Sequence, residues 1–192
     1  MKKRTAFIGA ILSLIPFGQP LLIKTGLVLS NTVQIIVFPL KVNAKSIDFY
    51  LKKLQEIYRQ DGKENLTIYY ANELLKIDPF NIDAYWFRAY AKVEKGLYTD
   101  GIQDYKKSIE LGDNDSMTWT NIGFANSKLG DYYGAISNYN KSIEMDPKNI
   151  TAFLNRGWAK KTIGDVRGSC DDWREAIRLG DNSIKQRVMK EC

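Results

Sequence analysis

The sequence predicts an all-α fold made of repeated helical hairpins, and three columns of residues carry this prediction. Gly62, Gly96, Gly130 and Gly164 are each 34 residues apart. The same period relates a column of helix-ending residues (Pro79, Asp113, Pro147 and Asp181) and a column of aliphatic residues (Leu75, Ile109, Ile143 and Ile177). A period of 34 residues is typical of helix–turn–helix units that stack into a solenoid.

Four units fit this period, at residues 48–81, 82–115, 116–149 and 150–183. The first helix of each unit, helix A, is expected to end at the glycine column, because a left-handed C-terminal position favours glycine. Helix B follows and ends at Asp-Pro or at Leu-Gly-Asp-Asn, which both stop helices. Residues 184–192 are long enough for a short helix that caps the last apolar face.

Small residues recur where helices A and B of one unit are expected to cross. The axes of packed helices lie roughly 8–10 Å apart, and a large side chain at the crossing would push them further apart. The small residues are Ala89, Gly123 and Gly157 in helix A, and Gly101, Ala135 and Ser169 in helix B.

The third unit carries the most complete pattern, and through it the chain resembles the tetratricopeptide repeat (TPR) family. Where that family has W, L, G, G, Y, A, F or Y, and P, this unit has Trp119, Ile122, Gly123, Gly130, Tyr132, Ala135, Tyr139 and Pro147. The second and fourth units depart from the pattern at the leucine position, which holds Arg88 and Arg156. The resemblance implies a solenoid that acts as a protein-interaction module.

Arginine and aspartate vary together between the units. The second unit has Arg88 with Asp104, the fourth has Arg156 with Asp172, and the third has Ile122 with Asn138 in the same places. If these positions face each other on antiparallel helices, each Arg–Asp couple is a structural salt bridge within one unit, with bidentate geometry available to the arginine.

The resemblance also implies a concave groove lined by helix A at unit positions 2, 5, 9 and 12. A row of exposed aromatic side chains there favours a protein or peptide partner. The alternative is that these rings pack on one another, on the leader or on the capping helix. Two asparagine amides at position 6 are suited to an extended peptide backbone. The expected groove residues are Trp86, Tyr90, Thr120, Asn121, Phe124, Leu154, Asn155 and Trp158.

Residues 1–44 read as a hydrophobic leader. Basic residues at 2–4 precede an apolar stretch, which is the pattern of a secretory signal, and Val42-Asn43-Ala44 fits a signal-peptidase site that would leave a mature domain 45–192. One alternative is an uncleaved anchor that places the domain outside the cytoplasm. Another is a two-span hairpin over 5–23 and 25–40, with Lys24 at its turn and the repeats on the cytoplasmic face of a membrane.

Composition argues against several function classes. The net charge of +6 resides in residues 1–45, since the basic residues of 46–192 balance the 22 acidic ones, and this removes the support for nucleic-acid binding. The chain has no histidine, the commonest metal ligand and general base. We therefore expect no metal site, no cofactor and no catalytic residues.

Cys170 and Cys192 are the two cysteines. Cys170 stands where the other units have isoleucine, so it serves as a small buried apolar group. In an exported protein it can also form a disulfide with Cys192 and hold the C-terminal cap.

Taken together, these features predict a non-catalytic scaffold or assembly factor that is exported or membrane-anchored and binds a protein or peptide. The alternative is a scaffold on the cytoplasmic face, tethered by the membrane hairpin.

Overall fold

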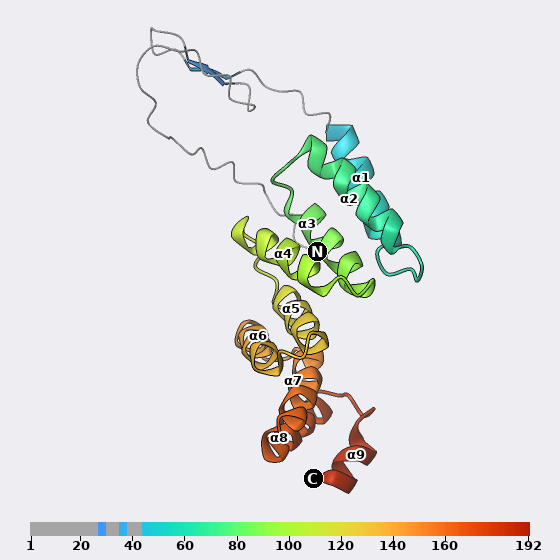
Figure 1. Cartoon of the computed structure of the whole chain (residues 1–192), viewed down its shortest axis with the longest axis vertical. Helices are drawn as coiled ribbons and strands as arrows, with labels where there is room; N and C mark the ends of the chain where they lie inside the picture. The colour runs from blue at the N-terminus through green and yellow to red at the C-terminus, as the bar shows by residue number, and fades with distance from the viewer. Residues whose placement is uncertain (1–26, 30–34, 38–43) are drawn as a thin grey trace. The chain divides into compact units, whose positions relative to one another are not determined.

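The computed structural model describes residues 27–29, 35–37 and 44–192 (Figure 1). The chain divides into two units, Met1–Val42 and Asn43–Cys192. In the first unit, β1 (Leu27–Leu29) pairs with β2 (Ile35–Val37) in an antiparallel ladder that sets Leu27 opposite Val37. The greater part of the apolar leader, including residues 42–43 of the expected cleavage site, lies outside the described residues. Among those that are described, no helix is long and apolar enough to cross a membrane.

The second unit consists of consecutive helical hairpins followed by one short helix, as the sequence predicts. Helices A and B of the first two hairpins are α1 (Ala44–Ile57) and α2 (Glu64–Ile77), then α3 (Ile82–Glu94) and α4 (Tyr98–Glu110). The next two hairpins are α5 (Ser116–Lys128) with α6 (Tyr132–Met145), and α7 (Ile150–Thr162) with α8 (Val166–Arg178). The last helix is α9 (Lys185–Glu191). The predicted TPR fold is therefore confirmed, and α1 begins four residues before the expected unit.

The turn inside each hairpin is built by the glycine column. Gly96 has a φ of 80°, a left-handed conformation that costs little only for glycine. Its N–H donates to the Val93 carbonyl, and the Leu97 N–H donates to the Lys92 carbonyl, so the last turn of α3 is closed by a Schellman motif. The following helix can then start at once and fold back along the first.

Each later hairpin is closed by an aromatic ring that fills the space beside a glycine. In the third hairpin, a Cβ on Gly123 would lie 2.6 Å from Cε1 of Tyr139. In the fourth, a Cβ on Gly157 would lie 2.3 Å from Nε1 of Trp173. Both rings are almost completely buried, and burial raises the pKa of Tyr139 to about 12. The small residues thus lie where the two helices of a hairpin are in closest contact.

Two hydrogen-bonded clusters of buried polar side chains join successive hairpins, and the sequence pattern did not indicate them. Between the second and third hairpins, Asp113 accepts hydrogen bonds from Ser108 (3.1 Å) and Thr118 (2.6 Å). Between the third and fourth, Asn149 Nδ2 donates to the hydroxyls of Thr120 (3.0 Å) and Ser142 (2.9 Å). Because each buried group has a partner, these clusters fix the angle between hairpins without the cost of an unsatisfied polar atom.

The ring–glycine contact gives a direct test of the packing. In Gly157→Ala the new methyl group collides with the Trp173 indole, and overpacking of this kind costs about 1–3 kcal/mol. That loss exceeds the gain of about 1 kcal/mol from replacing glycine in a helix interior. We expect urea denaturation to show a lower free energy of unfolding for Gly157→Ala. Ser137→Ala, at an exposed position of α6, serves as the control and should change stability by no more than a few tenths of a kcal/mol. A stabilised Gly157→Ala would contradict the packing described here.

Candidate functional site

The A helices α3, α5 and α7 contact one another in sequence, so their side chains form one continuous face. Tyr90, Phe124 and Trp158 stand at equivalent places on this face, and we call them the aromatic ladder. Tyr90 and Phe124 are half-buried, and Trp158 is 40% exposed. The remaining expected groove residues divide between this face and the interior.

The N-terminal part of the ladder is packed against itself. Trp86 stacks on Tyr90 with ring centroids 5.7 Å apart and an interplanar angle of 10°. Tyr58 of the loop after α1 meets both rings edge-on, at 5.8 and 5.5 Å. The indole N–H of Trp86 donates to the Thr118 hydroxyl at 3.0 Å. For Trp86 and Tyr90, the structure therefore matches the self-packing alternative, and only part of each ring is left for a partner.

Thr120 does not belong to a groove, so this prediction is wrong. Its side chain is 1% exposed, and its hydroxyl lies 2.8 Å from the Ser142 hydroxyl and accepts from Asn149. A threonine at position 5 is short enough for α5 to approach α6 and the next hairpin. Thr120, which the resemblance assigned to the groove, is therefore part of the polar cluster between the third and fourth hairpins.

The two asparagines expected to meet a peptide backbone are half-buried. Asn121 Nδ2 is buried without a hydrogen-bond partner among the residues that the structure describes. Asn155 lies next to Leu154, which is also half-buried and whose carbonyl accepts a 3.4 Å hydrogen bond from the Trp173 indole. The Asn121 amide is thus enclosed beside the Tyr105 hydroxyl and is not accessible to a peptide backbone.

The C-terminal end of the ladder is the more open one. The Trp158 ring meets Trp173 edge-on with centroids 5.0 Å apart. Cations lie over the ladder: Arg187 of α9 has its Cζ 4.6 Å from the Trp158 centroid, and Lys128 has its Nζ 5.1 Å from the Phe124 centroid. Trp158 therefore contacts the capping helix, as one alternative anticipated, while still exposing much of its ring.

The Arg–Asp couples lie on the other side of the A helices, because each arginine precedes a ladder ring by two residues and so points about 200° away round its helix. Arg88 donates two hydrogen bonds to Asp104, at 2.8 and 2.7 Å, and Lys92 lies 2.7 Å from the same carboxylate. In the fourth hairpin Arg156 makes the same pair of bonds to Asp172, at 2.9 and 2.5 Å. Asp104 and Asp172 are almost completely buried, so each carboxylate joins the two helices of its own hairpin.

Cys170 and Cys192 form a disulfide that ties α9 to α8. Cys170 is buried, in line with its place in the apolar column. Lys161 pairs with Glu191, and Arg174 donates to the Cys192 carbonyl at 3.1 Å, so polar contacts support the same attachment. Closing a loop of this size stabilises a fold by about 3 kcal/mol in the chain-entropy account.

Comparison with known proteins agrees with the fold. The tetratricopeptide repeat family model matches residues 116–149, the third hairpin. A crystal structure of MamA has a TM-score of 0.66 at 19% identity, over 77% of this chain and 79% of that one. YrrB, described as a TPR protein with an unusual peptide-binding site, has a TM-score of 0.59 at 15% identity, over 70% of this chain and 67% of YrrB. The comparison with curated proteins gave no match.

A further similar structure is the first TPR of Spaghetti (RPAP3) bound to the HSP90 peptide SRMEEVD. It has a TM-score of 0.54 at 17% identity, over 57% of this chain and 89% of that one. The architecture is that of a solenoid of helical hairpins. The third hairpin matches the tetratricopeptide repeat family model, and the described repeats share the fold of solved TPR structures such as YrrB.

The buried carboxylates give a test of how the hairpins are held. In Asp104→Asn, Arg88 and Lys92 lose their shared negative charge. We expect the free energy of unfolding to fall by about 2–3 kcal/mol, less than the roughly 3–5 kcal/mol of a fully buried pair, since both cations are 20% exposed. Urea denaturation measures the change. The control is Glu110→Gln, which breaks an exposed pair with Lys107 and should cost no more than about 1 kcal/mol. Equal effects of the two substitutions would rule out the role assigned to Asp104.

Proposed function

We propose that this chain is a non-catalytic interaction scaffold or assembly factor that binds a segment of another protein along the aromatic ladder. The observation that carries the proposal is Trp158, a tryptophan with 40% of its surface exposed in line with Tyr90 and Phe124. Tryptophan and tyrosine are enriched among the residues that dominate binding energy at protein interfaces. An array of this kind offers a long face on which a partner segment can lie.

The charges beside the ladder favour a partner segment that mixes apolar and acidic side chains. Arg59, Lys128, Lys161 and Arg187 each lie within 6 Å of a ring on or next to the ladder. Lys161 and Arg187 already pair with Glu191, so acidic side chains of the partner would meet Arg59 and Lys128 while its apolar side chains cover the rings. The lysine and asparagine set by which chaperone-binding TPR proteins hold a C-terminal carboxylate is not complete here: Lys52 occupies one place, but Glu56, Phe87 and Met117 occupy others.

The ladder is tested by purifying the full chain from its native cells and quantifying the proteins that come with it. We expect Phe124→Ala combined with Trp158→Ala to lose the principal partner, because Trp158 is the exposed ring of the ladder and Phe124, unlike Tyr90, stacks on no other described ring. Tyr133→Ala is the matched control, since Tyr133 is 74% exposed but lies on α6, away from the A helices. Thermal unfolding followed by circular dichroism checks that the double variant is folded. If a folded double variant retained every partner, the ladder would not be the binding face.

We further propose that the repeats act outside the cytoplasm, after export or on a membrane anchor. The basic and apolar leader supports this, and so does the pairing of Cys170 with Cys192, because disulfides persist in oxidising compartments. A scaffold on the cytoplasmic face, tethered by a membrane hairpin, is the alternative.

Cell fractionation with N-terminal sequencing and thiol labelling separates the two topologies. For an exported chain we expect a soluble form that starts at Lys45, and for an anchored chain a full-length form in the membrane. In either case, an alkylating reagent added without reductant should leave Cys170 and Cys192 unmodified, and it should label both after reduction. Equal labelling with and without reductant would argue for the cytoplasmic alternative.

A further inference from the structure

The junction between the second and third hairpins differs from the junctions on either side of it. At the junction before it, Arg88 of α3 binds Asp104 of its own hairpin and also donates to Asn72 of α2 at 2.8 Å. At the junction after it, Arg156 of α7 binds Asp172 and donates to Asn140 of α6 at 2.6 Å. Each arginine therefore links three helices, two of its own hairpin and one of the hairpin before.

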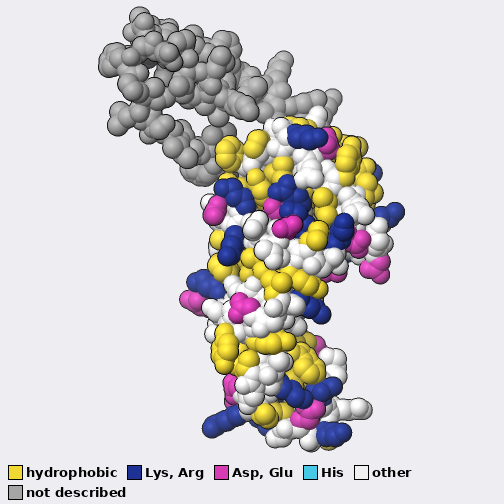
Figure 2. Space-filling view, viewed as in Figure 1, with side chains coloured by type: hydrophobic (Ala, Val, Ile, Leu, Met, Phe, Trp, Pro, Cys, Tyr) yellow, Lys and Arg dark blue, Asp and Glu magenta, His cyan; other side chains and the backbone are white. Residues whose placement is uncertain are grey.

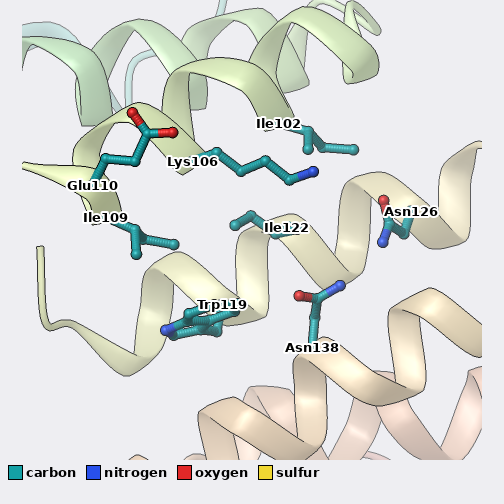
Figure 3. A pocket seen from close by; sticks show the side chains of 8 residues that line it. All are labelled: Ile102, Lys106, Ile109, Glu110, Trp119, Ile122, Asn126 and Asn138. Atoms are coloured by element: carbon teal, nitrogen blue, oxygen red, sulfur yellow. The ribbon is translucent and has the colours of Figure 1, made fainter.

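At the middle junction, Ile122 stands in the place of the arginine, Lys106 in the place of the asparagine and Asn138 in the place of the aspartate. A guanidinium that spans α4, α5 and α6 is therefore missing from this junction, and a pocket of about 370 Å³ opens between these helices (Figure 3). Ile102 and Ile109 of α4 and Trp119 and Ile122 of α5 give it an apolar lining, while Lys106 and Asn138 give it polar groups. Its volume lies at the lower end of the roughly 300–1,000 Å³ of ligand sites in proteins.

Lys106 is the charged group of this pocket that lacks a counter-ion. Glu110 also lines the pocket, but its carboxylate pairs with Lys107 at 2.9 Å. Over the part of the chain that the structure describes, no carboxylate lies within ion-pair distance of the Lys106 ammonium. Figure 3 shows the Lys106 side chain reaching from α4 towards α5, beside Ile102. The pocket thus combines an apolar surface with one solvent-exposed cation that has no ion-pair partner in the described part of the chain.

In the second and fourth hairpins, side chains of the protein itself fill the space that is equivalent to this pocket. There a carboxylate, Asp104 or Asp172, receives one arginine and one lysine. At the middle junction Ile122 replaces the arginine, Asn126 the lysine and Asn138 the aspartate, so the side chain that fills the space and all three charges are lost. Lys106, which stands where the other junctions have Asn72 and Asn140, supplies the cation of the pocket instead. A ligand with an apolar group and an adjacent carboxylate matches this combination.

We propose that this pocket is a second binding site, which takes an aliphatic side chain and an adjacent carboxylate from a partner polypeptide. The aliphatic group would lie against Ile109, Trp119 and Ile122, and the carboxylate would pair with Lys106. This site is separate from the aromatic ladder, because Phe124 follows Ile122 by two residues and so points about 200° away round α5. The chain can then hold two segments at once, one on each side of α5.

The test titrates the full chain, labelled with 5-fluorotryptophan, with the probe acetyl-Gly-Ser-Leu bearing a free carboxylate, and follows the ¹⁹F resonance of Trp119. Trp119→Phe assigns that resonance. We expect a saturable shift of the Trp119 signal, and binding weaker by about tenfold for the same peptide as its amide, because a hydrogen-bonded charge is lost. Equal affinity of acid and amide would overturn the proposal, as would a shift confined to Trp86 or Trp158.

Variants separate the pocket from its surroundings. Lys106→Gln should weaken binding of the free acid by about tenfold, whereas Lys107→Gln, its neighbour outside the pocket, should leave it unchanged. Lys106→Asn with Ile122→Arg and Asn138→Asp installs the three residues of the other junctions, which should fill the pocket and abolish binding. Phe124→Ala with Trp158→Ala should retain binding. Full binding by the triple variant or by Lys106→Gln would refute the site.

A third titration distinguishes the source of the carboxylate. Octanoate offers the same chemistry without a peptide, and we expect it to bind at least tenfold more weakly than acetyl-Gly-Ser-Leu, because it lacks the backbone groups that the amides of Asn126 and Asn138 can reach. Tighter binding of octanoate than of the peptide would show that the pocket takes a small amphiphile, and the proposed polypeptide partner would then be wrong.

Discussion

The repeat unit depends on one steric constraint, the contact between an aromatic ring of helix B and a small residue in helix A. Tyr139 lies against Gly123 and Trp173 against Gly157, where a Cβ would collide with the ring. In the second hairpin the same place holds Ala89, and the equivalent ring, Tyr105, is also buried. The contact brings two helices close enough to bury their shared apolar stripe, including Ala135. A helix of this length is marginal on its own in water, so the hairpin, rather than the helix, is the unit that folds.

On the face seen in Figure 2, basic and acidic side chains are interspersed over the repeats, consistent with the neutral composition of this part of the chain.

A second set of contacts turns separate hairpins into a stack, and these contacts are polar. The arginine couples join α2 to the second hairpin and α6 to the fourth, while the Asp113 and Asn149 clusters join the second to the third and the third to the fourth. Hydrogen bonds are directional, so they define an angle between hairpins that apolar contacts alone would leave loose. The middle junction has such a cluster but no arginine couple. The Trp86–Thr118 hydrogen bond and apolar packing around Ile122 hold it as well, and the space that the arginine couple fills at the other junctions is available to a ligand here.

The period of 34 residues sufficed to predict the hairpins and the capping helix, because turn glycines and small residues act locally. It did not suffice to assign the face of every side chain. Position 5 holds Trp86, Thr120 and Leu154, and only contacts between hairpins decide that the threonine is buried. The pocket also has a signal in the sequence, since Ile122 and Asn138 replace arginine and aspartate together. The sequence also shows Lys106 where the other junctions have asparagine. That Lys106 lies beside Ile122 depends on the angle between two hairpins, and the 34-residue period does not predict this angle.

The disulfide between Cys170 and Cys192 has a consequence for how the stack opens. In a quasi-one-dimensional array each hairpin is supported by its neighbours, so the last element, with a neighbour on one side, would be expected to open readily. At the C-terminal end the cross-link keeps α9 near α8 even when its other contacts break, so reclosure is fast and fraying is suppressed. The α1–α2 hairpin has no covalent restraint of this kind among the described residues. The disulfide therefore gives the array a reinforced C-terminal end, where opening is followed by rapid reclosure.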